Sequence, residues 1–150
     1  MKSSKEIKKM SLTVNAQVLK KVFEKAFGEI KNKYNLTMNE ILLLLYLEKS
    51  ENKDTAKDIV EDAMVAKSHI SKSVDSLTGK NLIKRVPDKE NKKIIHLIIN
   101  DEAKEIMNEL SKKEEDMIEL ALKGIPEENI KILEETLEKI KNNVREIITF

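Results

Sequence analysis

Two histidines and a few acidic runs are the side chains of this 150-residue chain that could support catalysis or hold a metal ion. His69 and His96 lie far apart with no carboxylate cluster beside them, which is a weak pattern for metal binding. The acidic runs at 114–116 and 134–135 are typical of solvated helix surfaces. The chain has no cysteine, no phosphate-binding loop and no nucleophile–base pattern. We therefore expect neither an enzyme nor a bound metal or cofactor.

Lysines and hydroxyls in the middle of the chain have a different chemistry, because they can contact a polyanion. Residues 63–93 contain 8 basic and 3 acidic side chains, a net charge of +5, whereas residues 94–150 carry a net charge of −6. Concentrated positive charge is expected of a protein that binds phosphates. Charge alone fits a solvated lysine-rich surface equally well, so the elements that carry these residues must decide.

The first of these elements is a predicted helix over residues 66–80. Its apolar stripe, Ile70, Val74 and Leu77, is narrow, so most of the helix must stay exposed. The exposed face carries lysines, hydroxyls and one histidine, with Asp75 and Ser76 further along. The N-terminal residues of such a helix usually reach base edges in the major groove. The predicted DNA contacts are therefore Lys67, Ser68, His69, Ser71 and Lys72.

A β-hairpin is predicted next. Two β-branched runs, residues 82–86 and 94–99, flank a polar turn at 87–93, and Asn81 suits a left-handed helix stop. The tip carries Lys89, Lys92 and Lys93, which can reach phosphates. Lysine favours point-charge contact over bidentate base recognition. We expect this wing to supply mainly sequence-independent affinity; an ordinary solvated turn is the alternative.

Helices on both sides must position these two elements. Apolar spacing predicts helices over residues 5–33, 38–49, 55–62 and 101–122, and a last helix after Gly124 and Pro126. Thr37 and Glu40 form a capping-box pattern, and Thr55 with Asp58 forms a weaker one. The helix at 38–49 is apolar nearly all round and should be central. The order predicts a mainly α fold with a small β-hairpin, a winged helix-turn-helix with long flanking helices.

Residues 37–110 resemble the DNA-binding lobe of the MarR family of bacterial and archaeal transcription regulators. The order and spacing of several segments carry the resemblance, rather than any one motif, and the long helices extend it to nearly the whole chain. The segments are Leu36-Thr37, Thr55-x-x-Asp58-Ile59, Lys67-Ser68-x-Ile70-Ser71-Lys72-x-Val74-Asp75-x-Leu77, Asn81-Leu82-Ile83-Lys84-Arg85, Asp88-x-Glu90-Asn91-Lys92-Lys93 and Leu97-Ile98-Ile99.

This resemblance implies a sequence-specific regulator of transcription, usually a repressor, that binds double-stranded DNA as a homodimer on a pseudo-palindromic site. Residues 36–100 would form the DNA-binding lobe, and residues 1–35 and 101–150 the helical dimerisation region. Apolar stripes near both termini agree with this, although packing within one chain is the alternative. The interface candidates are Ile7, Met10, Val14, Ile140, Val144, Ile147, Ile148 and Phe150.

Many members of the family also bind a small ligand between the dimer helices and the DNA lobe. A small-molecule effector that releases DNA is therefore a further expected partner. Phe23, Phe27 and Met107 could border such a cleft, but plain core packing is the stronger interpretation, and no ligand residues are assigned.

Four positions depart from the family pattern. The wing usually carries an Asp and an Arg where this chain has Asn91 and Lys92, and the Arg usually reads the minor groove. Asn81 replaces a glycine, although asparagine tolerates the same left-handed backbone. Asp54 replaces an apolar residue before Thr55, so the short third strand of the wing sheet should be weak. The wing is therefore expected to anchor phosphates rather than read sequence.

Two other functions fit the same elements: a winged helix that docks proteins without binding DNA, and a purely structural helical dimer. The local charge of +5 favours DNA. No apolar run approaches the roughly 20 residues that cross a bilayer, and no signal-peptide segment follows the basic N-terminus. We expect a cytoplasmic protein with no membrane partner.

Overall fold

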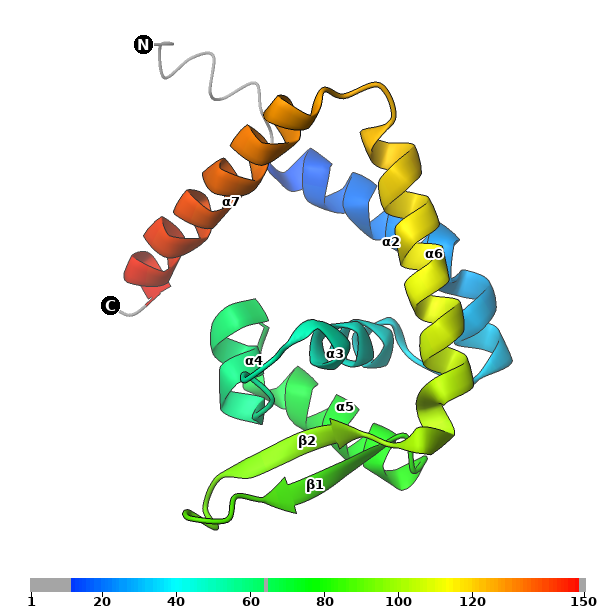
Figure 1. Cartoon of the computed structure of the whole chain (residues 1–150), viewed down its shortest axis with the longest axis vertical. Coiled ribbons are helices and arrows are strands. Elements are labelled where there is room, and N and C mark those ends of the chain that lie inside the picture. The colour runs from blue at the N-terminus through cyan, green and yellow to red at the C-terminus, as the bar shows by residue number, and fades with distance from the viewer. Residues whose placement is uncertain (1–11, 64, 149–150) are drawn as a thin grey trace. The chain divides into compact units, whose positions relative to one another are not determined.

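The structure is a computed structural model that describes residues 12–63 and 65–148. Figure 1 shows the elements in chain order, and this order confirms the predicted fold class. They are α2 (Leu12–Lys33), α3 (Met38–Lys49), α4 (Ala56–Ala63), α5 (Lys67–Gly79), β1 (Ile83–Pro87), β2 (Ile95–Ile99), the 3-10 turn η1 (Asp101–Ala103), α6 (Lys104–Leu122) and α7 (Glu127–Ile148). Residues 5–11 of the predicted first helix lie outside the described residues.

The chain divides into two compact units at the boundary between Glu114 and Glu115, within α6. The first unit contains α2 to α5, the hairpin and the first part of α6. The second contains the last turns of α6 and all of α7, after a turn in which Gly124 has φ 79°. Every helix within the described ranges is too short or too polar to cross a membrane.

The helix α3 supplies much of the core of the first unit, which confirms its predicted central position. The predicted capping box is present, since the Glu40 amide donates to the Thr37 hydroxyl at 3.2 Å and the Thr37 amide donates to the Glu40 carboxylate at 2.7 Å. The helix is less completely buried than its apolar sequence predicted, because Leu42 is 43% exposed. Its buried apolar residues are Ile41, Leu43, Leu44, Leu45 and Leu47.

The helix α4 also begins with a reciprocal cap, where the sequence indicated only a weak one. The Asp58 amide donates to the Thr55 hydroxyl at 3.2 Å, and the Thr55 amide donates to the Asp58 carboxylate at 3.1 Å. Ile59 is the buried residue of this short helix. Both helices that lead into α5 therefore have fixed N-termini, which sets the direction in which the chain enters them.

The predicted stripe on α5 is buried: Ile70, Val74 and Leu77 are 6%, 4% and 0% exposed. The helix ends as predicted at Asn81, whose φ is 59°. The Leu82 amide then donates to the Leu77 carbonyl at 2.9 Å, the closing bond of a left-handed helix stop. Burial of one face only leaves the opposite face of α5 in solvent.

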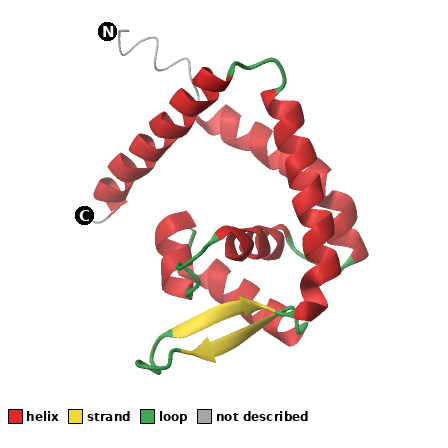
Figure 2. Cartoon of the chain, viewed as in Figure 1, coloured by secondary structure: helices red, strands yellow, loops and turns green. Residues whose placement is uncertain are grey.

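The hairpin joins β1 to β2 as an antiparallel pair, with Ile83 opposite Ile99 and Val86 opposite His96. Figure 2 shows these two strands and the loop that closes them. The third strand is weak, as Asp54 predicted: it is reduced to a single bridge between Thr55 and His96, beside a 2.9 Å bond from the Leu97 amide to the Asp54 carbonyl. The wing is therefore a two-stranded arm tied at its base.

Candidate nucleic-acid interface

The structure places all five residues predicted to contact DNA from the helix in the N-terminal half of α5, and all five are exposed. Within the described ranges, none of their side chains makes a hydrogen bond or ion pair with another residue. Unpartnered donors on one helix face remain free to bond an external ligand. These residues are Lys67, Ser68, His69, Ser71 and Lys72.

The N-terminus of α5 adds backbone donors to this surface. Ala66 is the N-cap and supplies no side-chain acceptor, and the first turn contains no acidic residue. Among the described residues, no side chain caps the first amides of the helix, which form the positive end of the helix dipole. Such an end favours phosphate oxygens.

Not all the basic residues counted in the sequence are available to DNA. Lys80 donates to the Glu40 carboxylate at 3.0 Å and to the Asn35 carbonyl at 2.6 Å. Arg85 of β1 forms an ion pair with Asp75 of α5. The Asp75 carboxylate on the exposed face of α5 is therefore already paired within the chain. These two cations hold elements together, and the free positive charge lies on Lys67, Lys72, Lys84, Lys89, Lys92 and Lys93.

Glu40 connects α3 to the far end of α5. It is only 2% exposed, and it is bonded to Ser76, to the Thr37 amide and to Lys80. Burial alone would raise the pKa of Glu40, but these three hydrogen bonds outweigh it and hold the pKa below its usual value. Ser76 is accordingly half-buried rather than exposed as predicted. The capping pattern indicated Glu40, but its second role depends on α5 folding back over α3.

The wing turn is organised by Asp88, one residue beyond β1. Its carboxylate accepts hydrogen bonds from the Glu90 amide at 2.9 Å and the Asn91 amide at 2.8 Å. These bonds, with help from His96, hold the pKa of Asp88 below its usual value. The predicted tip residues Lys89, Lys92 and Lys93 are exposed on this turn. An ordered turn therefore presents three lysines without side-chain partners in the described part of the chain.

His96 has a larger role than the sequence indicated, where it was interpreted as an ordinary strand residue. Its Nδ1 lies 2.6 Å from Oδ1 of Asp54, and its Nε2 lies 3.1 Å from Oδ2 of Asp88. Hydrogen bonds to Asp54 and then Asp88 raise the pKa of His96, against a smaller opposing effect of burial. The available signal was a polar residue, Asp54, at a position where an apolar one is usual.

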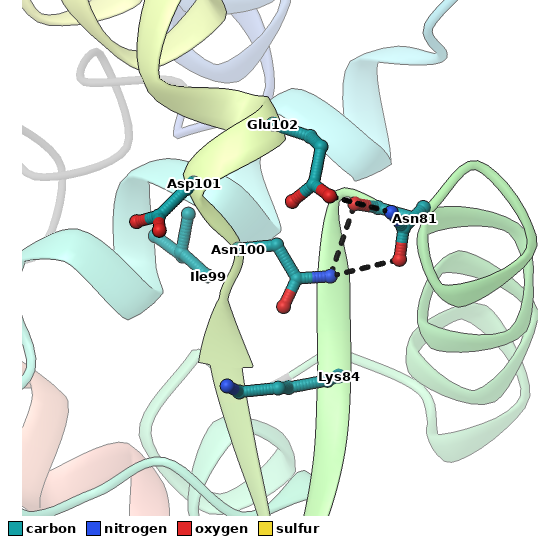
Figure 3. Close-up of a pocket in the computed structure, with 6 residues that line it drawn as sticks. All are labelled: Asn81, Lys84, Ile99, Asn100, Asp101 and Glu102. Atoms are coloured by element: carbon teal, nitrogen blue, oxygen red, sulfur yellow. Dashed lines mark hydrogen bonds between the residues drawn. The ribbon is translucent and has the colours of Figure 1, made fainter.

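The root of the wing meets η1 through amide side chains. Asn100 donates to the Asn81 backbone carbonyl at 3.0 Å, and Asn81 donates to Glu102 at 2.9 Å. Figure 3 shows this network around a shallow pocket of about 330 Å³, with Lys84 lying apart from the bonded groups. The bonds fix the angle at which the strands leave α5 and enter α6.

The structure describes only some of the residues that were predicted to form the dimer interface. Ile7, Met10 and Phe150 lie outside the described residues, while Val14 falls in α2 and Ile148 ends α7. Ile140 and Ile147 are 49% and 73% exposed, and Val144 is half-buried. Other apolar residues of α7 are also exposed, namely Ile132, Leu133 and Leu137. Phe27 and Met107, by contrast, are buried in the core, in agreement with the packing interpretation.

Solved structures with the same fold are transcriptional regulators. A MarR family regulator from Listeria monocytogenes, solved with a 26mer DNA, has a TM-score of 0.77 at 21% identity over 97% of this chain and 91% of that one. The regulator BldR from Sulfolobus solfataricus has a TM-score of 0.74 at 19% identity over 95% of this chain and 99% of that one. CouR from Rhodococcus jostii RHA1, bound to p-coumaroyl-CoA, has a TM-score of 0.73 at 14% identity over 89% and 93%.

No curated protein sequence is significantly similar to this chain. A family model does match, and it is described as transcriptional regulator SarA/Rot. The match covers residues 25–110, more than half of the 150 residues, and includes α3 to α5 and the hairpin. The chain therefore belongs to the SarA/Rot family of transcriptional regulators and has the winged-helix fold of the MarR regulators.

Proposed function

We propose that this regulator binds double-stranded DNA through α5 and the wing, and that it acts as a repressor at a specific site. One observation carries the proposal: five donor side chains stand exposed and unpartnered on one half of a helix whose other face is buried. A helix of this kind fits the major groove. Ser68, His69 and Ser71 can bond base edges, while Lys67 and Lys72 can bond bases or phosphates.

The wing supplies the second part of the interface. Lys89, Lys92 and Lys93 on its turn would contact phosphates beside the groove occupied by α5. The MarR family relative that was solved with DNA supports this use of the fold. Since lysines anchor phosphates without reading sequence, we assign specificity to α5 and sequence-independent affinity to the wing.

We further propose that the regulator is a homodimer, with residues 36–100 as its DNA-binding lobe and residues 1–35 and 101–150 as its dimerisation region. The exposed apolar residues of α7 support this assignment, because a helix with such a face needs a partner. A two-fold dimer places two recognition helices about one DNA turn apart and selects a pseudo-palindromic site. Action on chromosomal DNA would place the protein in the cytoplasm.

Release by a small molecule is the remaining part of the proposal. CouR was solved with p-coumaroyl-CoA, and the organohalide-sensing regulator RdhR with 2,4-dichlorophenol. These structures support the proposal that a small molecule binds to this regulator as well. The buried positions of Phe27 and Met107 give no reason to place it between them.

Selection of bound DNA from a random-sequence pool tests the proposed function. We expect enrichment of one motif whose two half-sites are related by two-fold symmetry, with centres about 10 base pairs apart. Recovery of a single asymmetric half-site would contradict the dimer. Recovery of no motif, with no retention of any duplex, would contradict DNA binding and favour a protein-docking role.

A further inference from the structure

We propose that His96 is a positioning residue for the wing, and that its protonation ties the wing to the N-terminus of α4, so that DNA affinity falls as pH rises. The inference rests on the proposed function, since it concerns the arm that carries Lys89, Lys92 and Lys93. It starts from geometry: one imidazole ring lies between two carboxylates from different parts of the chain.

The two carboxylates approach opposite nitrogens of the ring. Asp54 lies 2.6 Å from Nδ1 and Asp88 lies 3.1 Å from Nε2, so both contacts are within hydrogen-bond range. A protonated imidazole donates from both nitrogens and satisfies both carboxylates. A neutral imidazole carries one N–H, and its other nitrogen becomes an acceptor facing an acceptor oxygen. Loss of the proton therefore breaks one of the two contacts.

Each carboxylate belongs to a segment that matters for DNA contact. Asp54 precedes Thr55, which caps α4, and its carbonyl accepts the Leu97 amide at 2.9 Å. Asp88 holds the wing turn through the Glu90 and Asn91 amides. The protonated ring thus connects the lysine-bearing turn to the helix-turn-helix, in a sheet whose third strand is a single bridge.

Among the described residues, most other charged groups on the neighbouring elements are bonded to partners other than His96. On α4, Asp58 is bonded to Thr55 and Lys57 lies 3.9 Å from Glu61. On β1, Arg85 pairs with Asp75, and Val86 is the residue opposite His96. Lys84 of β1 is exposed. Among the described residues, the charged groups bonded to His96 are therefore the two carboxylates.

The direction of the pH effect follows from these partners. Asp54 and Asp88 raise the pKa of His96 above its ordinary value of 6.5. Because the pKa is higher in the folded wing, the stabilisation is fully present below about pH 6.5 and is lost as pH rises through the raised value. The wing should be most firmly held in mildly acidic solution.

The test measures affinity for a selected DNA duplex by fluorescence anisotropy from pH 6.0 to 8.5 at constant salt. We expect the affinity of the full chain to fall across this range, with the midpoint of the fall above pH 6.5, because the contact that holds the wing is lost as His96 loses its proton. His96→Gln should abolish this dependence and give weak binding throughout. His69 is the only other histidine and is retained in both chains, so a pH dependence that disappears in His96→Gln belongs to His96.

Asp54→Asn distinguishes the positioning of the wing by His96 from a general effect of negative charge on DNA binding. Removal of a negative charge near DNA should by itself tighten binding, as expected for the control Asp101→Asn, which changes an exposed aspartate outside this cluster. Loss of the negative charge that pairs with protonated His96 predicts the opposite, weaker binding by Asp54→Asn at pH 6.5. Histidine ring NMR should show the His96 pKa above 6.5 in the natural chain and lower in Asp54→Asn.

Two results would overturn the inference. One is DNA affinity that stays the same across the pH range in the natural chain, or that falls equally in His96→Gln; the other is tighter binding by Asp54→Asn with an unchanged His96 titration. Absence of DNA binding at every pH is a different result, because it contradicts the proposed function itself. Thermal unfolding of His96→Gln and Asp54→Asn at pH 6.5 checks that both remain folded.

Discussion

Lys80 and Lys92 have the same side chain on the same basic segment, yet their surroundings give them different roles. Lys80 reaches Glu40 at 3.0 Å and the Asn35 carbonyl at 2.6 Å, whereas Lys92 is exposed on the wing turn. The sequence counts both as one positive charge. The sequence does not show that Lys80 connects α5 to α3, because its partner Glu40 lies 40 positions away along the chain. Lys92, in contrast, is exposed and can contact a ligand.

Substitutions at Lys92 and Ser68 should have different signatures on DNA. Lys92→Ala removes one phosphate contact, so it should weaken all duplexes alike and reduce the salt slope by about 0.9. Ser68→Ala or His69→Ala should alter preference among sites, by about 1–3 kcal/mol at the affected base pair. Lys112→Ala, an exposed lysine of α6, is the control for lost charge. Relaxed specificity in Lys92→Ala would mean that the wing reads sequence.

Glu40→Gln should destabilise the fold by about 1–3 kcal/mol in urea unfolding at pH 7, because a buried, hydrogen-bonded carboxylate loses its charge. The lowered pKa of Glu40 determines how this stability difference changes with pH. Its stabilisation is present above the ordinary value of 4.5 and is lost as pH falls through the lowered one, so the difference from the natural chain should shrink in acid. Glu115→Gln, exposed on α6, should change stability by less than about 0.5 kcal/mol. Equal effects of both would contradict a structural role for Glu40.

At the scale of elements, local patterns predicted most of the fold. Capping at Thr37, the stripe on α5 and the stop at Asn81 are each decided within a few residues, so the sequence predicts them directly. The same holds for the exposed face of α5. Contacts between distant segments were not predictable. His96 contacts Asp54, 42 positions away, and Asp88, 8 positions away, and no local periodicity of the sequence encodes these two contacts.

The link from α5 into the wing gives a test of the backbone at Asn81. Its φ of 59° strains any residue with a Cβ, although asparagine tolerates it better than most. Asn81→Gly and Asn81→Ala both lose the amide bonds to Glu102 and Asn100, so their difference isolates the backbone. The Gly variant should be more stable by about 1 kcal/mol in thermal unfolding. Equal stability, or a more stable Ala variant, would show that the left-handed conformation imposes no cost.

At the scale of the whole molecule, the exposed apolar residues of α7 support the proposed homodimer. The apolar residues on α7 are widely exposed, with Leu137 at 53% and Ile132 at 60%, and no other described helix has so little buried apolar surface for its length. A regulator that binds a two-fold symmetric DNA site as a dimer needs a surface that joins its two copies, and the apolar face of α7 is suited to that role. In the sequence, the homodimer is what the resemblance to the MarR family implies, and the apolar stripes near both termini agree with it.

Leu137→Asp should convert the proposed dimer to a monomer in sedimentation velocity, because a charge would be buried in the interface. DNA affinity should fall with it, since one half-site alone would be bound. Lys139→Asp places the same side chain two positions along α7, on the opposite face of the helix, and should leave the dimer intact. If the natural chain sediments as a stable monomer, both the proposed dimer and the pseudo-palindromic DNA site are contradicted.

Salt dependence of DNA binding tests the central claim most directly. With a selected duplex, log affinity should fall linearly with log salt, with a slope of about −0.9 for each phosphate neutralised, and Lys92→Ala combined with Lys93→Ala should make the slope shallower by about 1.8. This result would establish that the lysines of the wing hold phosphates of the duplex. No binding to any duplex at roughly 50 mM salt, or a slope unchanged by the two wing substitutions, would contradict it.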